Sequence, residues 1–129
     1  MLAVIAAVAE TQDPKLNGCR RDGDGVARAV RLCLERAGFQ RDDIRAVVAG
    51  GSWTRTSQQA EMAALRNVFG NAMPPIYATV EQTGFLPAAG ALFGLAAGVR
   101  LVADGSARHV LITGSDITGP HAAMIISHP

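Results

Sequence analysis

The sequence has few aromatic residues, few cysteines and no excess of charge of one sign. Phe, Trp and Tyr make up 5% of its 129 residues, and the two cysteines are Cys19 and Cys33. Two cysteines cannot form the disulfide framework of a small secreted domain, so we expect reduced thiols and a cytoplasmic location. Twelve basic and eleven acidic residues leave a net charge of +1. This balance argues against nucleic acid or an anionic membrane as a partner.

Signatures of targeting, cofactor binding and metal binding are also missing. The apolar segment Met1–Glu10 lacks the basic region and cleavage site of a signal peptide. Gly50-Gly51-Ser52 follows a predicted strand, but neither a GxGxxG pattern nor a Walker lysine accompanies it, so no cofactor is expected. Asp22-Gly23-Asp24-Gly25 lacks the other ligands of a calcium loop, and the histidines are dispersed, so no metal site is predicted.

The composition that remains is that of a globular chain with one very apolar segment. Hydrophobic residues make up 49% and charged residues 18%, which excludes a disordered chain, and residues 1–129 are expected to form a single domain. Gly84–Ala103 contains a single charge, Arg100. It is almost long enough to span a membrane, but Pro87 and the interrupting glycines argue against that function. A helix that is apolar on all sides must be covered, so we expect a partner surface.

Strand-like and helix-like segments alternate along the chain. The predicted strands are Leu2–Val8, Ile44–Ala49, Pro74–Thr79, His109–Thr113 and Ala122–Ser127, and the predicted helices run from Asp24 to Ala37, from Ser57 to just before Gly70, and from Gly84 to Ala103. This β-α-β-α-β-α-β-β order predicts an α/β fold, in which helices cover both faces of a five-stranded mixed sheet. Leu2–Val8 is expected to be buried on both faces, with a loop from Thr11 to Arg21. Asp24 and Ser57 are the expected N-caps, and Gly38 suits a helix C-terminus.

Four segments carry a family resemblance. They are Asp24–Ile44 (DGVARAVRLCLERAGFQRDDI), Ala49–Leu65 (AGGSWTRTSQQAEMAAL), Thr83–Gly90 (TGFLPAAG) and Gly119–Ile126 (GPHAAMII). Their order and spacing resemble the C-terminal half of a β-ketoacyl synthase, a member of the thiolase-like superfamily. The resemblance covers essentially the whole chain and implies half of a thiolase-like fold. The N-terminal half of such an enzyme, which carries the nucleophilic cysteine, is not part of this sequence.

The same resemblance implies that the catalytic positions are degenerate. Gly50 and Phe85 stand where the family has its two catalytic histidines, Val80 stands at the family's lysine, and Asp116 stands at the phenylalanine gate. The two histidines stabilise the enolate of decarboxylative condensation, and the side chains of glycine and phenylalanine cannot donate such hydrogen bonds. The resemblance therefore implies no catalytic residue in this chain, as in chain-length factors, which are also degraded ketosynthases.

Binding and interface candidates follow from the same comparison. Trp53 and Phe85 are expected to fill the former active site or to line an acyl contact surface. Glu81 and Asp116 are expected in loops at the strand ends, where such sheets bind ligands, or are simply solvated charges. In a complete thiolase fold, the third helices of two halves form a central layer. The interface that this arrangement implies consists of Phe85, Leu86, Leu92, Phe93, Leu95 and Val99.

Three hypotheses for the function remain open. The first is a non-catalytic ketosynthase-like subunit of a fatty-acid or polyketide system, which completes a complex or shapes an acyl or carrier-protein surface. The second is one chain of a split β-ketoacyl synthase. The third is an unrelated flavodoxin-like domain that binds a small molecule, which the all-round apolar helix disfavours. The expected partner is a second copy or a ketosynthase-type chain, and an acyl carrier protein in addition.

Overall fold

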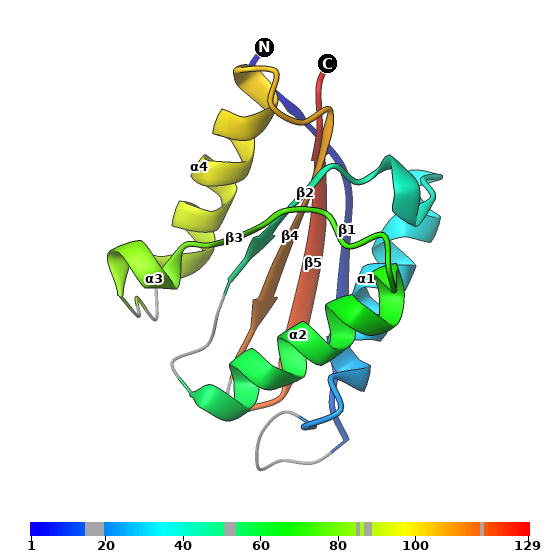
Figure 1. Cartoon of the computed structure of the whole chain (residues 1–129), viewed down its shortest axis with the longest axis vertical. Helices are drawn as coiled ribbons and strands as arrows, with labels where there is room; N and C mark the ends of the chain where they lie inside the picture. The colour runs from blue at the N-terminus through cyan, green and yellow to red at the C-terminus, as the bar shows by residue number, and fades with distance from the viewer. Residues whose placement is uncertain (15–19, 51–53, 85, 87–88, 117) are drawn as a thin grey trace.

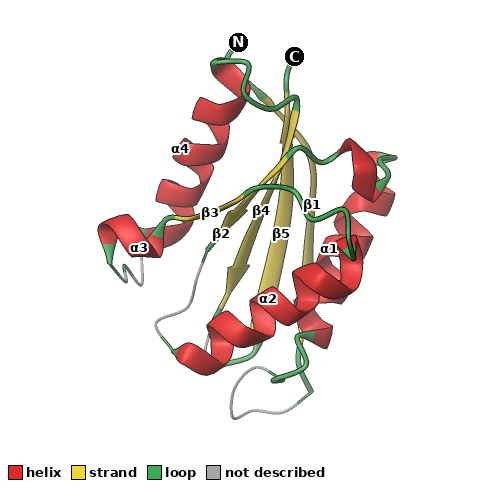
Figure 2. Cartoon of the chain, in the orientation of Figure 1, coloured by secondary structure: helices red, strands yellow, loops and turns green. Residues whose placement is uncertain are grey.

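One mixed sheet of five strands forms the centre of the molecule (Figures 1 and 2). The computed structural model describes residues 1–14, 20–50, 54–84, 86, 89–116 and 118–129. The strands are β1 (Val4–Gln12), β2 (Ala46–Ala49), β3 (Ile76–Ala78), β4 (His109–Ser115) and β5 (Pro120–Ser127), in the spatial order β1-β5-β4-β2-β3. Strands β2, β3 and β4 are parallel, and β5 is antiparallel to both β4 and β1. The predicted mixed sheet is confirmed.

The helices lie on both faces of this sheet, as predicted. Helices α1 (Asp24–Ala37) and α2 (Arg55–Phe69) lie on one face, and α4 (Gly90–Ala103) lies on the other (Figure 1). A single turn of 3-10 helix (Arg41–Asp43) precedes β2, and a short helix, α3 (Val80–Thr83), follows β3. The order of the main elements therefore matches the sequence pattern.

The two faces of the sheet are covered unequally. On the α1 and α2 side, large side chains such as Val30, Leu65 and Phe69 are fully buried. On the other side, α4 packs over β4, with fewer contacts to β2 and β5, and Val102 and Val110 lie in a smaller core. Among the described residues, no helix covers β1 on this second face, and β5 is covered only in part.

The segment Gly84–Ala103 does not form one continuous helix. Gly84 ends α3 with a φ of +71°, and α4 begins only at Gly90. The residues of α4 that are buried are Gly94, Gly98 and Val102, whereas Leu92 and Phe93 are 67% and 47% exposed. The helix thus approaches the sheet with its glycines and leaves large apolar side chains uncovered.

Strand β1 is an edge strand, so the prediction that it is buried on both faces was wrong. It begins at Val4 and continues to Gln12, through positions predicted as loop. Ala7 and Ala9 face α1, but Ile5 is 60% and Val8 40% exposed. Successive side chains in a strand point to opposite faces, and here only one of those faces is covered by a helix.

Several predicted element ends are also corrected. Gly38 ends α1 in the left-handed conformation, as expected, but the N-cap of α1 is Gly23 rather than Asp24. The N-cap of α2 is Thr54, whose Oγ1 accepts a hydrogen bond from the backbone N–H of Ser57 at 3.1 Å. Ser57 therefore lies inside the helix. The third strand is limited to the three residues Ile76–Ala78 because Pro74 and Pro75 precede it and α3 follows.

Candidate functional site

A cavity of about 770 Å³ lies between α4 and the uncovered part of the sheet. Its walls are mostly apolar. The predicted positions Gly50, Val80, Leu86, Leu92, Leu95 and Asp116 all line it. The structure therefore brings together Val80 of α3, Leu92 and Leu95 of α4, Leu86 from the segment between these helices, and Gly50 and Asp116, which follow β2 and β4. Trp53 and Phe85 lie outside the described residues.

Gly50 has no room for a side chain. An added Cβ would lie 2.4 Å from the carbonyl oxygen of Thr113, a backbone atom of the neighbouring strand β4. Real Cβ atoms essentially never approach so closely, so any larger residue requires a shift of β2 against β4. Packing therefore disfavours a histidine at position 50, independently of the family resemblance.

Asp116 and Glu81 occupy different environments. Asp116 follows β4 and is exposed. Its Oδ1 accepts hydrogen bonds from Oγ1 of Thr118 at 2.6 Å and from the backbone N–H of Thr118 at 2.8 Å. These two hydrogen bonds lower the pKa of Asp116, with the side-chain bond as the larger cause. Glu81 was expected in a loop but lies in the helix α3, where it is exposed beside a smaller hollow of about 270 Å³. Asp116 lines the main cavity and Glu81 lines this hollow.

A buried acidic residue of α2 lies beside β4. Glu61 is 4% exposed, and its Oε1 accepts a hydrogen bond from Oγ1 of Thr113 at 2.5 Å. Glu61 also borders the smaller hollow. The sequence analysis missed this pair because Glu61 appears as one polar position within an otherwise ordinary amphipathic helix.

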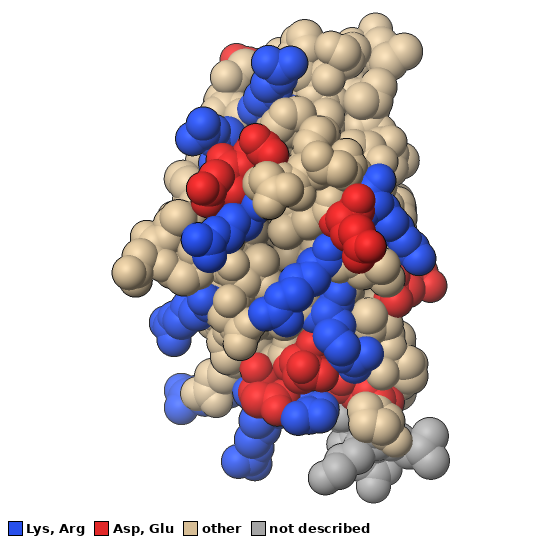
Figure 3. Space-filling model, turned by 90° about the vertical axis from the view of Figure 1, so that its right-hand side faces the viewer, with Lys and Arg blue, Asp and Glu red and all other residues tan. Residues whose placement is uncertain are grey.

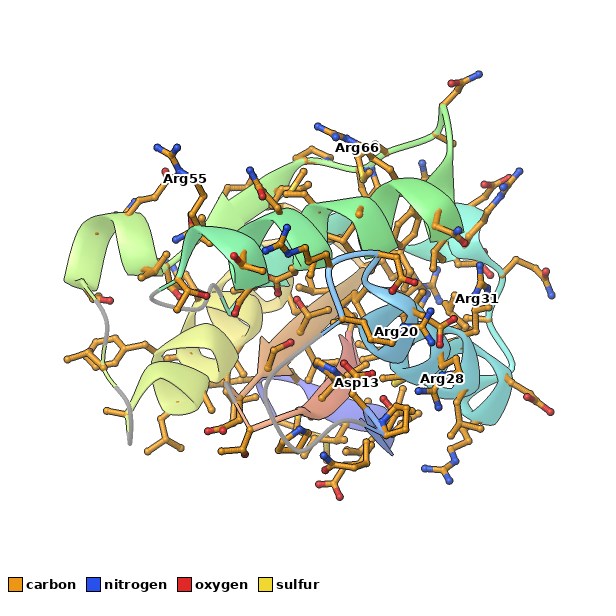
Figure 4. The ribbon with its side chains drawn as sticks, turned by 90° about the horizontal axis from the view of Figure 1, so that it is seen from below. Asp13, Arg20, Arg28, Arg31, Arg55 and Arg66 are labelled. Carbon is orange, nitrogen blue, oxygen red and sulfur yellow. The ribbon has the colours of Figure 1, made fainter. Side chains whose placement is uncertain are left out.

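A second buried pair that the sequence did not predict lies at the lower end of the sheet. His121 Nε2 donates to Asp13 Oδ2 at 2.9 Å, and each side chain is 1% exposed. His121 Nδ1 lies 3.0 Å from Ser115 Oγ, and the backbone N–H of Arg20 donates to Asp13 Oδ2 at 2.8 Å. Arg20 and Arg28 lie beside Asp13 in Figure 4. Both ring nitrogens of His121 thus have partners, and His121 and Ser115 also line the end of the main cavity.

Charge is distributed over the opposite side of the molecule. Figure 3 shows Lys and Arg interspersed with Asp and Glu on the side where α1 lies. Helix α4 contains one charged residue, Arg100, which pairs with Asp104 at 3.6 Å. The polar surface and the apolar surface are therefore on opposite faces of the sheet.

The part of the chain that the structure describes contains neither a candidate membrane-spanning helix nor a candidate metal-binding cluster. No helix there is both long enough and apolar enough to cross a bilayer. Nor do the described His, Cys, Asp and Glu residues include a group of three that is placed to hold a metal ion. Cys33 is fully buried, and burial raises the pKa of its thiol.

Solved structures with a similar fold include ketosynthases. The ishigamide ketosynthase/chain length factor superposes with a TM-score of 0.91 at 22% identity, over 99% of this chain and 38% of that one. A ketosynthase in complex with its chain length factor from Xenorhabdus doucetiae gives a TM-score of 0.87 at 18% identity, over 100% of this chain and 40% of that one. These similarities show that the chain has the fold of part of a ketosynthase chain.

Sequence comparison then gives the family. Residues 2–111 match the model of the β-ketoacyl synthase, C-terminal domain, and the chain belongs to this family. It is 31% identical over 105 residues to the tetracenomycin polyketide synthase ketoacyl synthase beta subunit of Streptomyces glaucescens, over 81% of this chain and 26% of that protein. It is 36% identical over 76 residues to the erythronolide synthase of Saccharopolyspora erythraea, over 58% of this chain and 2% of that protein. The chain thus spans about a quarter of the first relative's length.

Proposed function

We propose that the chain is a non-catalytic ketosynthase-like subunit of a polyketide or fatty-acid system that completes a thiolase-type assembly. The observation that carries this proposal is the packing at Gly50, where the carbonyl of Thr113 leaves no space for a catalytic side chain. Decarboxylative condensation needs hydrogen-bond donors at the developing enolate, and a glycine side chain supplies none. The similarity to a ketoacyl synthase beta subunit agrees with this function.

The uncovered face of α4 supports the second part of the proposal. Leu92 and Phe93 are exposed beside a largely apolar cavity that Leu86 and Leu95 also line. Monomeric proteins rarely expose contiguous apolar patches of more than a few hundred Å², and larger ones usually mark an interface. A second thiolase-type half would cover this face and bury the residues that the sequence predicted as interface.

The test combines a condensation assay with co-purification. The chain alone, supplied with acyl and malonyl carrier-protein thioesters, is expected to give no condensation product. Mixed with a cysteine-bearing ketosynthase and its carrier protein, it is expected to co-purify and to change product yield or chain length. The variant Leu92→Asp places a charge on the uncovered face without altering the buried core, and it is expected to lose co-purification with the partner. Turnover by the chain alone would contradict the non-catalytic function, and product formed only with a partner chain would favour a split synthase.

A further inference from the structure

We propose that the partner that covers α4 is a second copy of this chain, with the two α4 helices parallel and side by side. The proposal rests on the proposed function, since it names the partner of the same uncovered face. In this dimer, the twofold axis is parallel to the two α4 helices and lies between them.

The width of the uncovered groove beside α4 suits a second helix. Strands in a sheet lie about 4.8 Å apart, and a helix with its side chains is about 10 Å wide. Helix α4 lies over β4 and also contacts β2 and β5, so the uncovered strip consists of β1 and the part of β5 that lines the cavity, and it is about one helix wide at the Gly90 end. Val8 of β1 and Met124 of β5 form the floor of that strip, and Leu95 of α4 forms its wall.

The protruding helix α4 and the groove lie side by side on one face of the sheet. A twofold interface requires a surface that is complementary to itself, in which residue i contacts j and j contacts i. Here α4 is the ridge and the β1 and β5 strip is the groove. Rotation about an axis parallel to α4 places the α4 of each copy over the strip of the other.

The spacing of apolar residues along α4 suits contact with a second helix. Leu92, Leu95 and Val99 follow one another at intervals of three and four residues, and Leu92 and Leu95 line the cavity. That spacing places the three residues on one side of the helix, as in the seam of a parallel helix pair, while Leu95 and Val99 also pack in part against the smaller core of their own chain. Gly94 and Gly98 lie on another side of the helix, against Ile112 of the sheet.

The charges at the lower end of the groove, Glu10 and the positive N-terminal end of α4, complement each other in a dimer. Helix α4 begins without a side-chain cap and without an acidic residue in its first turn. Glu10 of β1 is exposed, lines the groove together with Gly90, and its carboxylate has no hydrogen-bond or ion-pair partner among the described residues. Glu10 pairs in register with Ala122, which brings it to the height at which α4 starts. In the parallel dimer, Glu10 of each copy lies at the positive N-terminal end of the other copy's α4, where a carboxylate is favourable.

The experiment uses the full chain and measures its mass in solution by sedimentation velocity between about 1 and 100 µM, a span that covers ordinary micromolar affinities. The expected result is a dimer whose dissociation constant rises about three- to thirtyfold in Glu10→Gln, because two helix-terminus contacts of about two- to fivefold each are lost. Leu92→Asp is expected to give a folded monomer with unchanged circular dichroism. The matched control for charge, Glu35→Gln on the exposed side of α1, leaves the dimer unchanged.

Cross-linking tests the parallel geometry. In a Cys19→Ser background, Leu92→Cys is expected to form an intermolecular disulfide with its own copy under mild oxidation, whereas the exposed Gln59→Cys on α2 is not. A dimer that survives Leu92→Asp, or equal cross-linking at both positions, overturns the proposal. A chain that is monomeric alone but binds a ketosynthase one-to-one also overturns it, and in that case leaves the proposed function standing.

Discussion

The carboxylate of Asp13 and the imidazole of His121 meet at 2.9 Å, although 108 residues separate them in the sequence. The contact ties the end of β1 to the hairpin between β4 and β5 and lies wholly out of solvent. Removing one partner of a buried polar pair leaves the other unsatisfied, so this contact is expected to be sensitive to substitution.

Replacement of Asp13 is expected to flatten the acid limb of the stability profile. Burial alone would raise the pKa of Asp13, but the hydrogen bonds from His121 and from the N–H of Arg20, with the nearby charges of His121 and Arg28, outweigh it and lower that pKa. A carboxyl whose folded-state pKa lies below its unfolded value of 3.8 stabilises the fold above that value and loses the contribution as the pH falls through the folded pKa.

The measurement is urea denaturation of the wild type and Asp13→Asn between pH 2 and 7. Asp13→Asn is expected to cost about 1–3 kcal/mol at pH 7 and to show a smaller loss of stability below pH 4 than the wild type. Asp42→Asn, at the exposed Arg41–Asp42 pair, is the control and is expected to change the free energy of unfolding by less than about 1 kcal/mol. Parallel acid limbs for wild type and Asp13→Asn would contradict the assignment.

The hydroxyl of Thr113 is expected to stabilise the fold through Glu61. Thr113→Val keeps the shape of the side chain but removes the donor to a carboxylate that is 4% exposed. The expected cost is about 1–3 kcal/mol in the free energy of unfolding, measured by urea denaturation at pH 7. Thr113→Ser retains the hydroxyl and is expected to recover most of this loss. An unchanged free energy of unfolding in Thr113→Val would contradict a stabilising hydrogen bond between Thr113 and Glu61.

The steric restriction at Gly50 predicts an unequal effect of two glycine substitutions at the same end of the sheet. Gly50→Ala is expected to destabilise by about 1–3 kcal/mol because its Cβ meets the Thr113 carbonyl at 2.4 Å. Gly114→Ala is the matched control, since no atom of the described residues outside its immediate neighbours lies within 4 Å of an added Cβ. Thermal unfolding of both variants measures the difference. If Gly50→Ala proves as stable as Gly114→Ala, the packing argument against a histidine at position 50 fails.

The element order was predictable from the sequence because it depends on local patterns. Apolar periodicity and a few glycines, such as Gly38, place the helices and strands without knowledge of their neighbours. The end of β1 was not predictable, since whether Glu10 and Gln12 join a strand depends on pairing with β5. Both Thr54 and Ser57 are residues that favour the N-cap position. The choice between them depends on the backbone conformation of residues 54–57, which the sequence pattern does not specify.

The candidate site was predictable only where the family resemblance reached. Gly50 and Asp116 were located by comparison, and the structure adds their surroundings. The reason that Gly50 excludes a side chain lies in the approach of β4, and no feature of the residues near position 50 encodes it. The pairs Asp13–His121 and Glu61–Thr113 are long-range contacts between single polar residues, which composition and periodicity do not reveal.

The guanidinium of Arg36 is expected to protect the edge strand. Its Nη1 donates to the carbonyl of Val8 at 2.7 Å, in a strand that lies at the end of the sheet. Edge strands present backbone groups that pair with other chains, and a charged side chain held against them opposes such pairing. Arg36→Ala is therefore expected to cost about 1 kcal/mol or less in stability but to aggregate faster on incubation at a temperature where both proteins remain folded.

Light scattering over time measures this effect. Arg31→Ala is the matched control, because Arg31 lies on the same helix and hydrogen-bonds to Asn67 of α2 rather than to β1. Arg36→Lys keeps a charge beside the strand and is expected to aggregate at a rate between those of wild type and Arg36→Ala. If Arg31→Ala aggregates as fast as Arg36→Ala, loss of surface charge in general accounts for the effect, and the contact with Val8 has no specific protective function.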